Sequence, residues 1–234
     1  MERVFKSEEK EVLLLDNSIT FINSLRRASY EIKTLAFKEV EFFKNDSVLH
    51  DEILAHRIGL IPLKNEKIKE DASIEFPLKF EAKNDGEEIL SQNIGDQVAI
   101  SNIPLVRLNK GQKVEFIARA KIGIGREHSR HLPGLVYYYN YNKISLKDEA
   151  KKHLELAERF PKVFEVKNNE VAVKNEWACN FDSEDVQVPG LEITPTEKIV
   201  FIVESFGMMS TSDIIKECVK VLDKDLEELK KELS

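Results

Sequence analysis

The sequence predicts an α+β fold, built mostly of antiparallel strands with a few helices. Three observations lead to this. Strand signals dominate the middle of the chain, between Ile74 and Ala120. Two turn clusters there, NDGEE at 84–88 and NKGQK at 109–113, are of the kind that joins antiparallel strands. One apolar strand, KIVFIVESFG, is followed directly by one long helix, so the chain does not alternate strand and helix throughout.

The first elements form a strand, a helix, a second strand and a short helix. KEVLLLDNS reads as a strand that ends at Asp16 and Asn17, after which Ser18 caps a helix that runs to about Tyr30. The apolar stripe of this helix is Ile22, Leu25, Ser29 and Ile32, flanked by Arg26 and Arg27. Strand spacing returns from Leu35 to Phe43, and a short helix follows from about Leu49 to Ile58.

After the middle strands, the stretch from Leu146 to Arg159 is predicted to be helical until Pro161 stops it. KVFEVKNNEVAVKN reads as a hairpin that turns at Asn168 and Asn169. A boundary is marked by Pro189, Gly190 and Pro195. The long helix then runs from about Ser212 to Leu233.

The long helix carries the clearest periodic signal in the chain. Its apolar residues are spaced 3, 4, 4, 3 and 4 apart: Ile215, Cys218, Leu222, Leu226, Leu229 and Leu233. We interpret this stripe as an a/d seam of the kind that packs on one partner helix. Periodicity does not distinguish packing against another chain from packing against the helix's own domain, so both stay open.

Composition excludes several classes of protein. The 234 residues include 35 basic and 42 acidic side chains, a net charge of -7, which argues against gripping nucleic acid through the whole surface. Cys179 and Cys218 lie far apart, so we expect reduced, structural thiols and a cytoplasmic protein. The apolar run near the start has only four residues, which excludes a signal peptide or a membrane span there.

DEILAHRIGLIPL, residues 51–63, offers a candidate site. Glu52 and His56 are four residues apart and could ligate a metal from one helix face. The competing explanation accounts for more residues: acids in the first turn (Asp51, Glu52) and basic side chains in the last (His56, Arg57) suit the helix dipole, and Gly59 and Pro62 end the helix. On that explanation Ile53, Leu54 and Ile58 form the buried side.

KIGIGREHSRHLPG, residues 121–134, offers a second one. Its glycines, Gly123 and Gly125, lack the third glycine and the βαβ setting of a phosphate loop. We interpret it as a solvent-facing loop that contacts a partner, with an inert loop and a metal or catalytic site as alternatives. An enzyme of the metal-dependent hydrolase class would use Glu52, His56, His128 and His131. The common nucleophile, zinc-protease, P-loop and C-x-x-C motifs do not occur in the sequence, so we expect no catalytic residues in this chain.

Taken in order, several of these runs resemble one family, the D subunits of archaeal DNA-directed RNA polymerase, which are related to the third-largest eukaryotic subunit and to the N-terminal region of the bacterial alpha subunit. The resemblance rests on FINSLRR at 21–27, DEILAHRIGLIPL at 51–63, the run from Ile103 to Gly134, and FIVESFG at 201–207 with the long helix after it. It covers nearly the whole chain.

The resemblance implies a discontinuous dimerisation domain of antiparallel strands and two helices, residues 1–34 and 191–234, with a mostly β domain, residues 35–190, inserted between. It implies a non-catalytic assembly scaffold for transcription that pairs with a smaller L-type subunit. That pair would then receive the largest subunits and small zinc-binding ones, with little direct contact to nucleic acid and none to a membrane.

Carried over by position, the resemblance places Ile22, Leu25 and the stripe from Ile215 to Leu233 at or near the pairing interface. Arg26 and Arg27 match the family's double arginine, which suits contacts to acidic or carbonyl groups of a large subunit. The 51–63 helix, with Asp51, Glu52, His56 and Arg57, and the loop from Gly123 to Pro133 look like further docking elements.

The chain departs from the family at three places. Lys33 precedes Thr34 where the family often has Pro-Thr, and His131 stands where a tryptophan is common. Many relatives carry a ferredoxin-like module with an iron-sulfur cluster, and residues 146–190 resemble it with Cys179 as the sole thiol and Phe160 in a cysteine's place. Because a cluster needs three or four thiolates, we predict no such cofactor. The hairpin core would then consist of Val163, Phe164, Val166, Val171, Val173 and Trp177.

Overall fold

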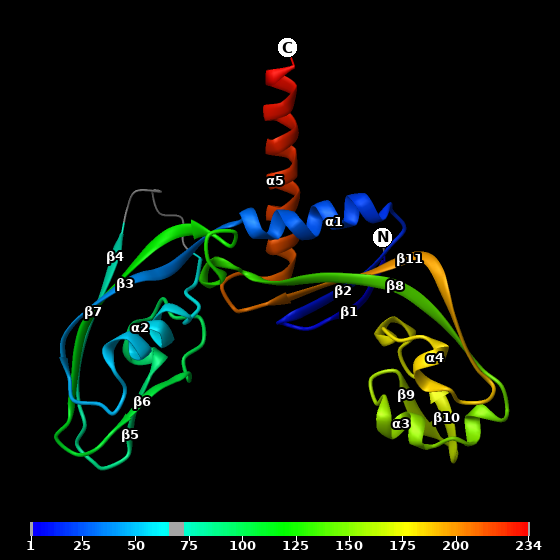
Figure 1. Ribbon diagram of the computed structural model, residues 1–234, viewed down its shortest axis with the longest axis horizontal. Coiled ribbons are helices and arrows are strands. Elements are labelled where there is room, and N and C mark those ends of the chain that lie inside the picture. Colours follow the sequence, from blue (N-terminus) through cyan, green and yellow to red (C-terminus); the bar gives the residue numbers. More distant parts are fainter. Residues whose placement is uncertain (1, 66–72, 234) are drawn as a thin grey trace. The chain divides into compact units, whose positions relative to one another are not determined.

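The computed structural model describes residues 2–65 and 73–233, which group into two compact units (Figure 1). Each unit is made of two separate stretches of chain. The first unit comprises Met1–Asn23 and Val136–Val203, and the second comprises Ser24–Leu135 and Glu204–Ser234. The boundary falls inside helix α1 (Ile19–Ala28). The division into residues 1–34 with 191–234 and an inserted 35–190 stays a prediction.

The first unit contains a four-stranded sheet in the order β1-β2-β11-β8. Its strands are β1 (Glu2–Lys6), β2 (Lys10–Leu15), β11 (Leu191–Ser205) and β8 (Gly134–Leu146). One face packs Val12, Leu14, Val200 and Ile202 with tyrosines of β8 and with Trp177. Trp177 is therefore a packing residue, as its lone occurrence suggests. It lies 5.5 Å from the ring of Phe5, and its carbonyl accepts a bond from Tyr139 Oη at 2.7 Å.

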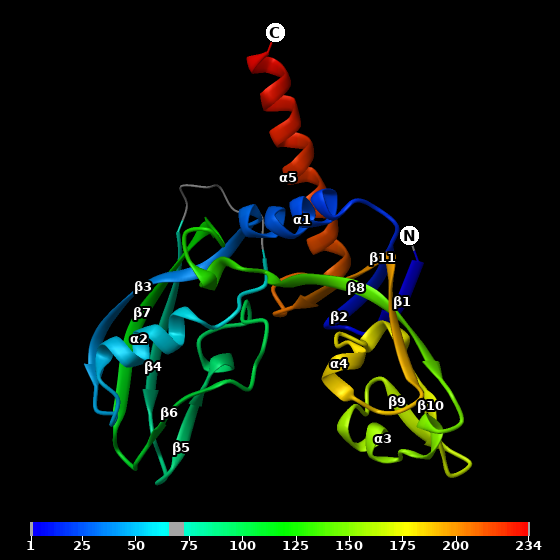
Figure 2. The same ribbon diagram turned by 45° about the vertical axis from the view of Figure 1, so that its right-hand side comes forward.

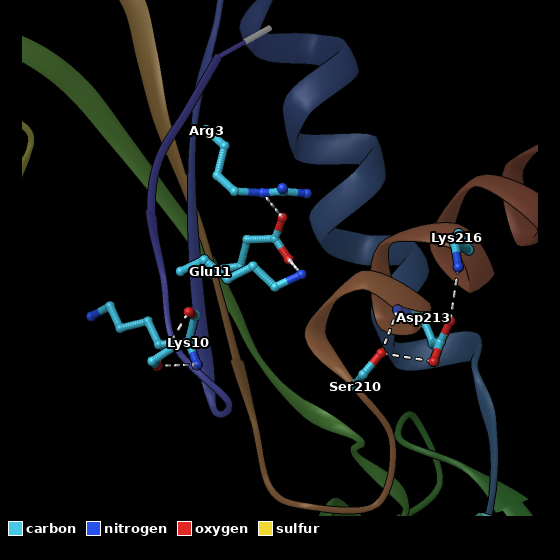
Figure 3. A network of polar contacts seen from close by, with 8 residues as sticks. Arg3, Lys10, Glu11, Ser210, Asp213 and Lys216 are labelled. Carbon is cyan, nitrogen blue, oxygen red and sulfur yellow. Dashed lines mark hydrogen bonds and ion pairs between the residues drawn. The ribbon is translucent and has the colours of Figure 1, made fainter.

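A buried carboxylate lies on β2 of this sheet. Glu11 is 1% exposed, and its Oε1 accepts a bond of 2.7 Å from Arg3 Nε on β1, as Figure 3 shows. Lys6 Nζ lies 3.9 Å from its second oxygen. Two cations of the neighbouring strand thus compensate the cost of burying this charge.

A small module between β8 and β11 has its own core. Its elements are α3 (Glu155–Arg159), the paired strands β9 (Phe164–Lys167) and β10 (Glu170–Val173), and α4 (Ser183–Val186), with α3 and α4 beside the hairpin in Figure 2. The predicted turn is confirmed, because Asn168 and Asn169 both have positive φ, 52° and 64°. The predicted helix from Leu146 to Arg159 is wrong in its length: Leu146 ends β8, and only a 3-10 turn, Ala150–Lys152, and the five residues of α3 are helical.

The predicted core of this module is correct in part. Val163, Phe164 and Val171 are at most 2% exposed, and Val173 packs against them. Val166, however, is 50% exposed, although it lies on the same strand face as Phe164, and Trp177 packs on the four-stranded sheet instead.

The second unit contains the three-stranded antiparallel sheet β3-β7-β4, a separate hairpin, and the helix α2. The sheet strands are β3 (Lys33–Asn45), β7 (Lys113–Ile124) and β4 (Ile74–Glu81), and the hairpin is β5 (Glu87–Leu90) with β6 (Pro104–Leu108). Helix α2 (Asp51–Gly59) contributes Leu54 and Ile58 to the core beneath the sheet, where Phe37 and Phe76 meet edge to face at 5.1 Å.

The two predicted glycine turns exist, but the strands that each one links do not pair with each other. NDGEE leads from β4 to β5 and NKGQK leads from β6 to β7, so both turns cross between the sheet and the hairpin. Gly86 and Gly111 have φ of 79° and 82°. Gly111 N donates to Ala82 O at 2.8 Å and Gly86 N to Leu108 O at 3.0 Å, so the two crossings are bonded together.

The second unit also holds α5 (Thr211–Glu232), which confirms the predicted long helix and packs against the 3-10 turn Ser29–Glu31. Its last turns extend beyond the strands of its unit (Figures 1 and 2). Among the described residues, no helix is both long and apolar enough to span a membrane.

Candidate subunit-interaction surface

The first turn of α5 is capped by its own side chains. Ser210 Oγ accepts a bond from Asp213 N at 3.2 Å and donates to Asp213 Oδ2 at 2.7 Å (Figure 3). Lys216 Nζ lies 3.1 Å from the other carboxylate oxygen. The Ser210 bond, and then Lys216, hold the pKa of Asp213 below its usual value. The helix start is thus stabilised at its positive end by an anion.

Three residues in the N-terminal half of α5 are buried. Thr211, Ile214 and Cys218 are all at most 2% exposed. A Cβ placed at Gly134 would lie 3.1 Å from Ile214 Cδ1, so the chain passes close beneath the helix here. Burial raises the pKa of Cys218 to about 12, which keeps the thiol protonated and inert at neutral pH.

The C-terminal half of α5 is exposed. Leu226 is 64%, Leu229 51% and Leu233 80% exposed, and Val219 is 42% exposed where its neighbour Cys218 is 2%. The outward stripe therefore contains Val219 in place of Cys218. Its residues are then spaced 4, 3, 4, 3 and 4 apart, an unbroken heptad pattern: Ile215, Val219, Leu222, Leu226, Leu229 and Leu233. We call these six residues the α5 seam.

Helix α1 buries the predicted stripe. Ser18 Oγ accepts a bond from Phe21 N at 3.3 Å, which confirms the predicted cap. The whole stripe is at most 7% exposed: Ile22, Leu25, Ser29 and Ile32. Arg26 is half-buried and Arg27 exposed. Sequence reasoning missed the outward apolar side chains Ile19, 56% exposed, and Phe21, 45% exposed, because they fall outside the stripe.

Helix α2 presents its predicted polar residues outward. Asp51, Glu52, His56 and Arg57 are all exposed. Asp51 Oδ1 accepts a bond of 2.7 Å from Asn45 Nδ2, and an Arg57 Nη donates to Pro104 O at 2.6 Å. One expectation is wrong: Ile53 is 47% exposed, since Leu54 and Ile58, four residues apart, face the core. Gly59 is the last helical residue, and the C-cap is the next residue, Leu60.

Within the 121–134 stretch, residues 126–129 are exposed, as predicted for a solvent-facing loop, and the rest is more buried. Strand β7 continues to Ile124, and a Cβ at Gly123 would meet the His131 ring at 2.6 Å. His131 is 4% exposed: its Nδ1 lies 3.1 Å from Thr34 O, and Thr34 Oγ1 donates to His131 O at 2.7 Å. Burial lowers the pKa of His131, and the Thr34 carbonyl opposes that shift in part. The glycine makes room for a histidine that joins β3 to this loop.

Arg130 and His128 add further hydrogen bonds to this contact between β3 and the loop after β7. Arg130 Nη1 donates to Phe37 O at 2.7 Å, and its Nε donates to His128 Nδ1 at 3.1 Å. The four residues of the hydrolase hypothesis therefore differ in setting: Glu52 and His56 are exposed on α2, whereas His131 is committed to Thr34. Over residues 2–65 and 73–233, no group of three or more His, Cys, Asp or Glu side chains is placed to hold a metal ion.

Cys179 is fully buried in the module of the first unit, where desolvation raises the pKa of its thiol. Its Sγ lies 3.4 Å from Phe181 O. Phe160, which the resemblance places at a cysteine position, stacks on Phe181 with ring centroids 4.2 Å apart. An aromatic pair thus packs near the residue that a cluster would need as a ligand.

A model of the RNA polymerase Rpb3/Rpb11 dimerisation domain matches residues 11–226 of the chain. The match covers β2, α1 and most of α5, the elements that carry the buried stripe and the start of the exposed seam.

Individual relatives agree with this match along nearly the full length. The DNA-directed RNA polymerase subunit Rpo3 of Pyrococcus horikoshii is 31% identical over 235 residues, covering 93% of this chain and 91% of that subunit. The Rpo3 of Thermococcus kodakarensis is 35% identical, over 87% and 85% of the two chains. The DNA-directed RNA polymerase II subunit rpb3 of Dictyostelium discoideum is 27% identical, over 95% and 90%.

Proposed function

The chain belongs to the RNA polymerase Rpb3/Rpb11 dimerisation-domain family, and from this we propose that it pairs through the α5 seam and α1 with a smaller, L-type polymerase subunit. It is a non-catalytic assembly subunit of a multi-subunit DNA-directed RNA polymerase of the archaeal kind. The finer assignment to the D type, with its bacterial alpha counterpart, is part of the proposal. So is a place in the cytoplasm.

One observation carries the pairing proposal. Three leucines of the seam, Leu226, Leu229 and Leu233, are each more than half exposed along one helix face. Leucines at heptad spacing gain stability when a second helix covers them, by about 25 cal/mol for each Å² of apolar surface removed from water. The N-terminal half of α5, where Ile214 and Cys218 are already buried, gains no such stability from a partner helix.

The remaining partners follow from the same proposal. The pairing domain would consist of residues 1–34 and 191–234, and the double arginine, Arg26 and Arg27, would contact one of the largest subunits. The exposed polar side of α2, with Glu52, His56 and Arg57, would dock a further subunit, and small zinc-binding subunits would complete the platform. Direct contact with nucleic acid would be small, in keeping with the net charge of -7.

The metal-dependent hydrolase alternative receives no support from the relatives named above, which are polymerase subunits. The structure also does not support a shared site for the four proposed residues, because His131 is hydrogen-bonded to Thr34 of β3.

Co-expression with an L-type subunit tests the pairing. We expect a complex whose mass, measured by light scattering, equals one copy of each chain. A Leu226→Ala/Leu229→Ala variant should bind the L-type subunit about a hundredfold more weakly or worse, because each truncated anchor costs roughly 1–2 kcal/mol or more.

The matched control is Val200→Ala, which removes apolar atoms from the core of the first unit and leaves the seam intact. It should lower the melting temperature without weakening the complex at temperatures where the chain is folded. A wild-type chain that stays monomeric in the presence of the L-type subunit would contradict the proposal.

A further inference from the structure

The seam of α5 has an acidic edge. Asp225 and Glu232 each stand one residue before a seam leucine and lie seven residues apart, so they occupy the same edge of the helix. The residues one and two heptads earlier on that edge, Cys218 and Thr211, are buried in the protein's own unit. Along this edge, the first two positions are therefore neutral and buried, and the next two are acidic and exposed.

The ion pairs recorded within α5 do not use these acids. Within residues 211–233 they join Lys216 to Asp213 at 3.1 Å, Lys220 to Glu217 at 2.6 Å, and Lys224 to Glu228 at 3.5 Å. None of the three pairs includes a residue of the acidic edge. Asp225 lines a groove that also contains Lys33, Arg126 and Lys224 of its own unit, but among the described residues neither Asp225 nor Glu232 takes part in an ion pair.

The opposite edge of the seam is mixed in sign. It carries Lys216, Asp223 and Lys230, spaced seven residues apart. A partner helix therefore meets two acids on one edge of the exposed half and one charge of each sign on the other. In paired helices the residues on these two edges form the interhelical ion pairs that decide partner and orientation.

We infer that the helix that covers the α5 seam belongs to a different chain and carries lysine or arginine side chains opposite Asp225 and Glu232. This inference rests on the proposed function and specifies the chemistry of the partner. Opposite charges at the rim raise the association rate and exclude wrong partners. Asp225 and Glu232 are thus specificity-determining residues of the pairing.

A second copy of this chain fits the edge poorly. When two copies of α5 pair antiparallel, like edges meet, and Asp225 of one copy faces Glu232 of the other. When they pair in parallel, Asp225 meets Lys230 five residues ahead, but Glu232 meets none of residues 211–233. A helix with a basic edge matches both acids, which favours a different chain over self-pairing.

Charge reversal tests the inference. The Asp225→Lys/Glu232→Lys variant and the Glu227→Lys/Glu228→Lys variant change the net charge equally, but the second alters the face away from the seam. We expect the first to bind a purified L-type subunit about tenfold more weakly than the wild type, and the second to bind within about twofold. The difference between the two variants should shrink in 1 M salt, where surface charges are screened.

Each outcome decides the inference. Equal affinities for both variants and the wild type would overturn it and leave the pairing proposal standing, since the heterodimer still forms. Tighter binding by the seam-edge variant would show an acidic partner edge and would overturn it too. A wild-type chain that forms a homodimer as tightly as the heterodimer would overturn the selection against self-pairing. No complex at all with wild type would overturn both proposals, and unchanged melting temperatures of both variants exclude unfolding as the cause.

Discussion

The two halves of α5 carry one continuous heptad of apolar residues but lie in different surroundings. Ile214 and Cys218 in the first half are at most 2% exposed, whereas Leu226 and Leu229 in the second are 64% and 51% exposed. Ile214 and Cys218 lie on the covered face beside the seam, whereas Glu228 and Asp225, at the same heptad positions in the second half, are exposed. Amphipathic spacing shows which face of a helix will be buried, but it does not show what buries it.

The outer face of the β3-β7-β4 sheet makes the contrast sharper. Its charges pair with one another across the strands: Arg119 lies 3.0 Å from Glu41 and 2.8 Å from Glu75, and Lys121 lies 3.0 Å from Glu39. Such exposed pairs add little stability each, but they leave the face polar and suited to water. The second half of α5 has leucines where this face has paired charges, which is the mark of a surface made for contact.

The largest expected effect distinguishes the two halves by stability. Ile214→Ala should lower the free energy of unfolding of the isolated chain by about 2–5 kcal/mol, because it opens a cavity in a fully buried site. Leu229→Ala should change it by less than about 0.5 kcal/mol, because the side chain is already half in water. Urea unfolding followed by circular dichroism measures both. Equal decreases in the free energy of unfolding for the two variants would mean that Leu229 is as buried in the isolated chain as Ile214.

A smaller effect tests how the first half is held. Ser210→Ala removes the cap of α5 and should lower the free energy of unfolding by about 1 kcal/mol. The loss should appear in the chain alone and leave the affinity for the L-type subunit within about twofold, since the cap lies far along the helix from Leu229. Ser101→Ala, at an exposed position outside α5, is the matched control, since it removes the same hydroxyl without touching the helix start.

The smallest effect is a pH dependence of the same anchored half. Because the folded pKa of Asp213 is depressed below 3.8, its stabilising contribution is present above that pH and is lost as the pH falls through the folded pKa. Melting temperatures of wild type and Asp213→Asn should therefore differ by a constant amount well above pH 3.8 and converge as the pH falls through the lowered pKa of the folded state. A difference that persists undiminished to about pH 2 would contradict the role of the Ser210–Asp213–Lys216 contacts.

Particular residues show how far the sequence alone reaches. Ser18 as a cap, the stripe from Ile22 to Ile32, the Asn168–Asn169 turn and the long C-terminal helix are all confirmed, because each depends on neighbours within a few positions of the chain. Ile53 and Val166 were assigned to the core and are exposed, because periodicity in a short element does not specify the width of its buried face.

His131 shows what the sequence could not reveal. Read alone, two histidines and two glycines between residues 123 and 131 suggest a ligand site or an open loop. In the structure Gly123 leaves space for the His131 ring, and Thr34, 97 positions away, bonds both its ring and its carbonyl. That pairing depends on the register of β3 against β7, which is set by many cross-strand contacts together.

The sequence by itself determined most of the elements, the family and the existence of an apolar stripe on the last helix, since these follow from local spacing and from motifs. Only the tertiary structure decided that Val219, not Cys218, belongs to the outward seam and that the cover ends near Leu222. The physical reason is that adjacent residues on a helix point about 100° apart, so a small rotation against the rest of the unit buries one and exposes the other.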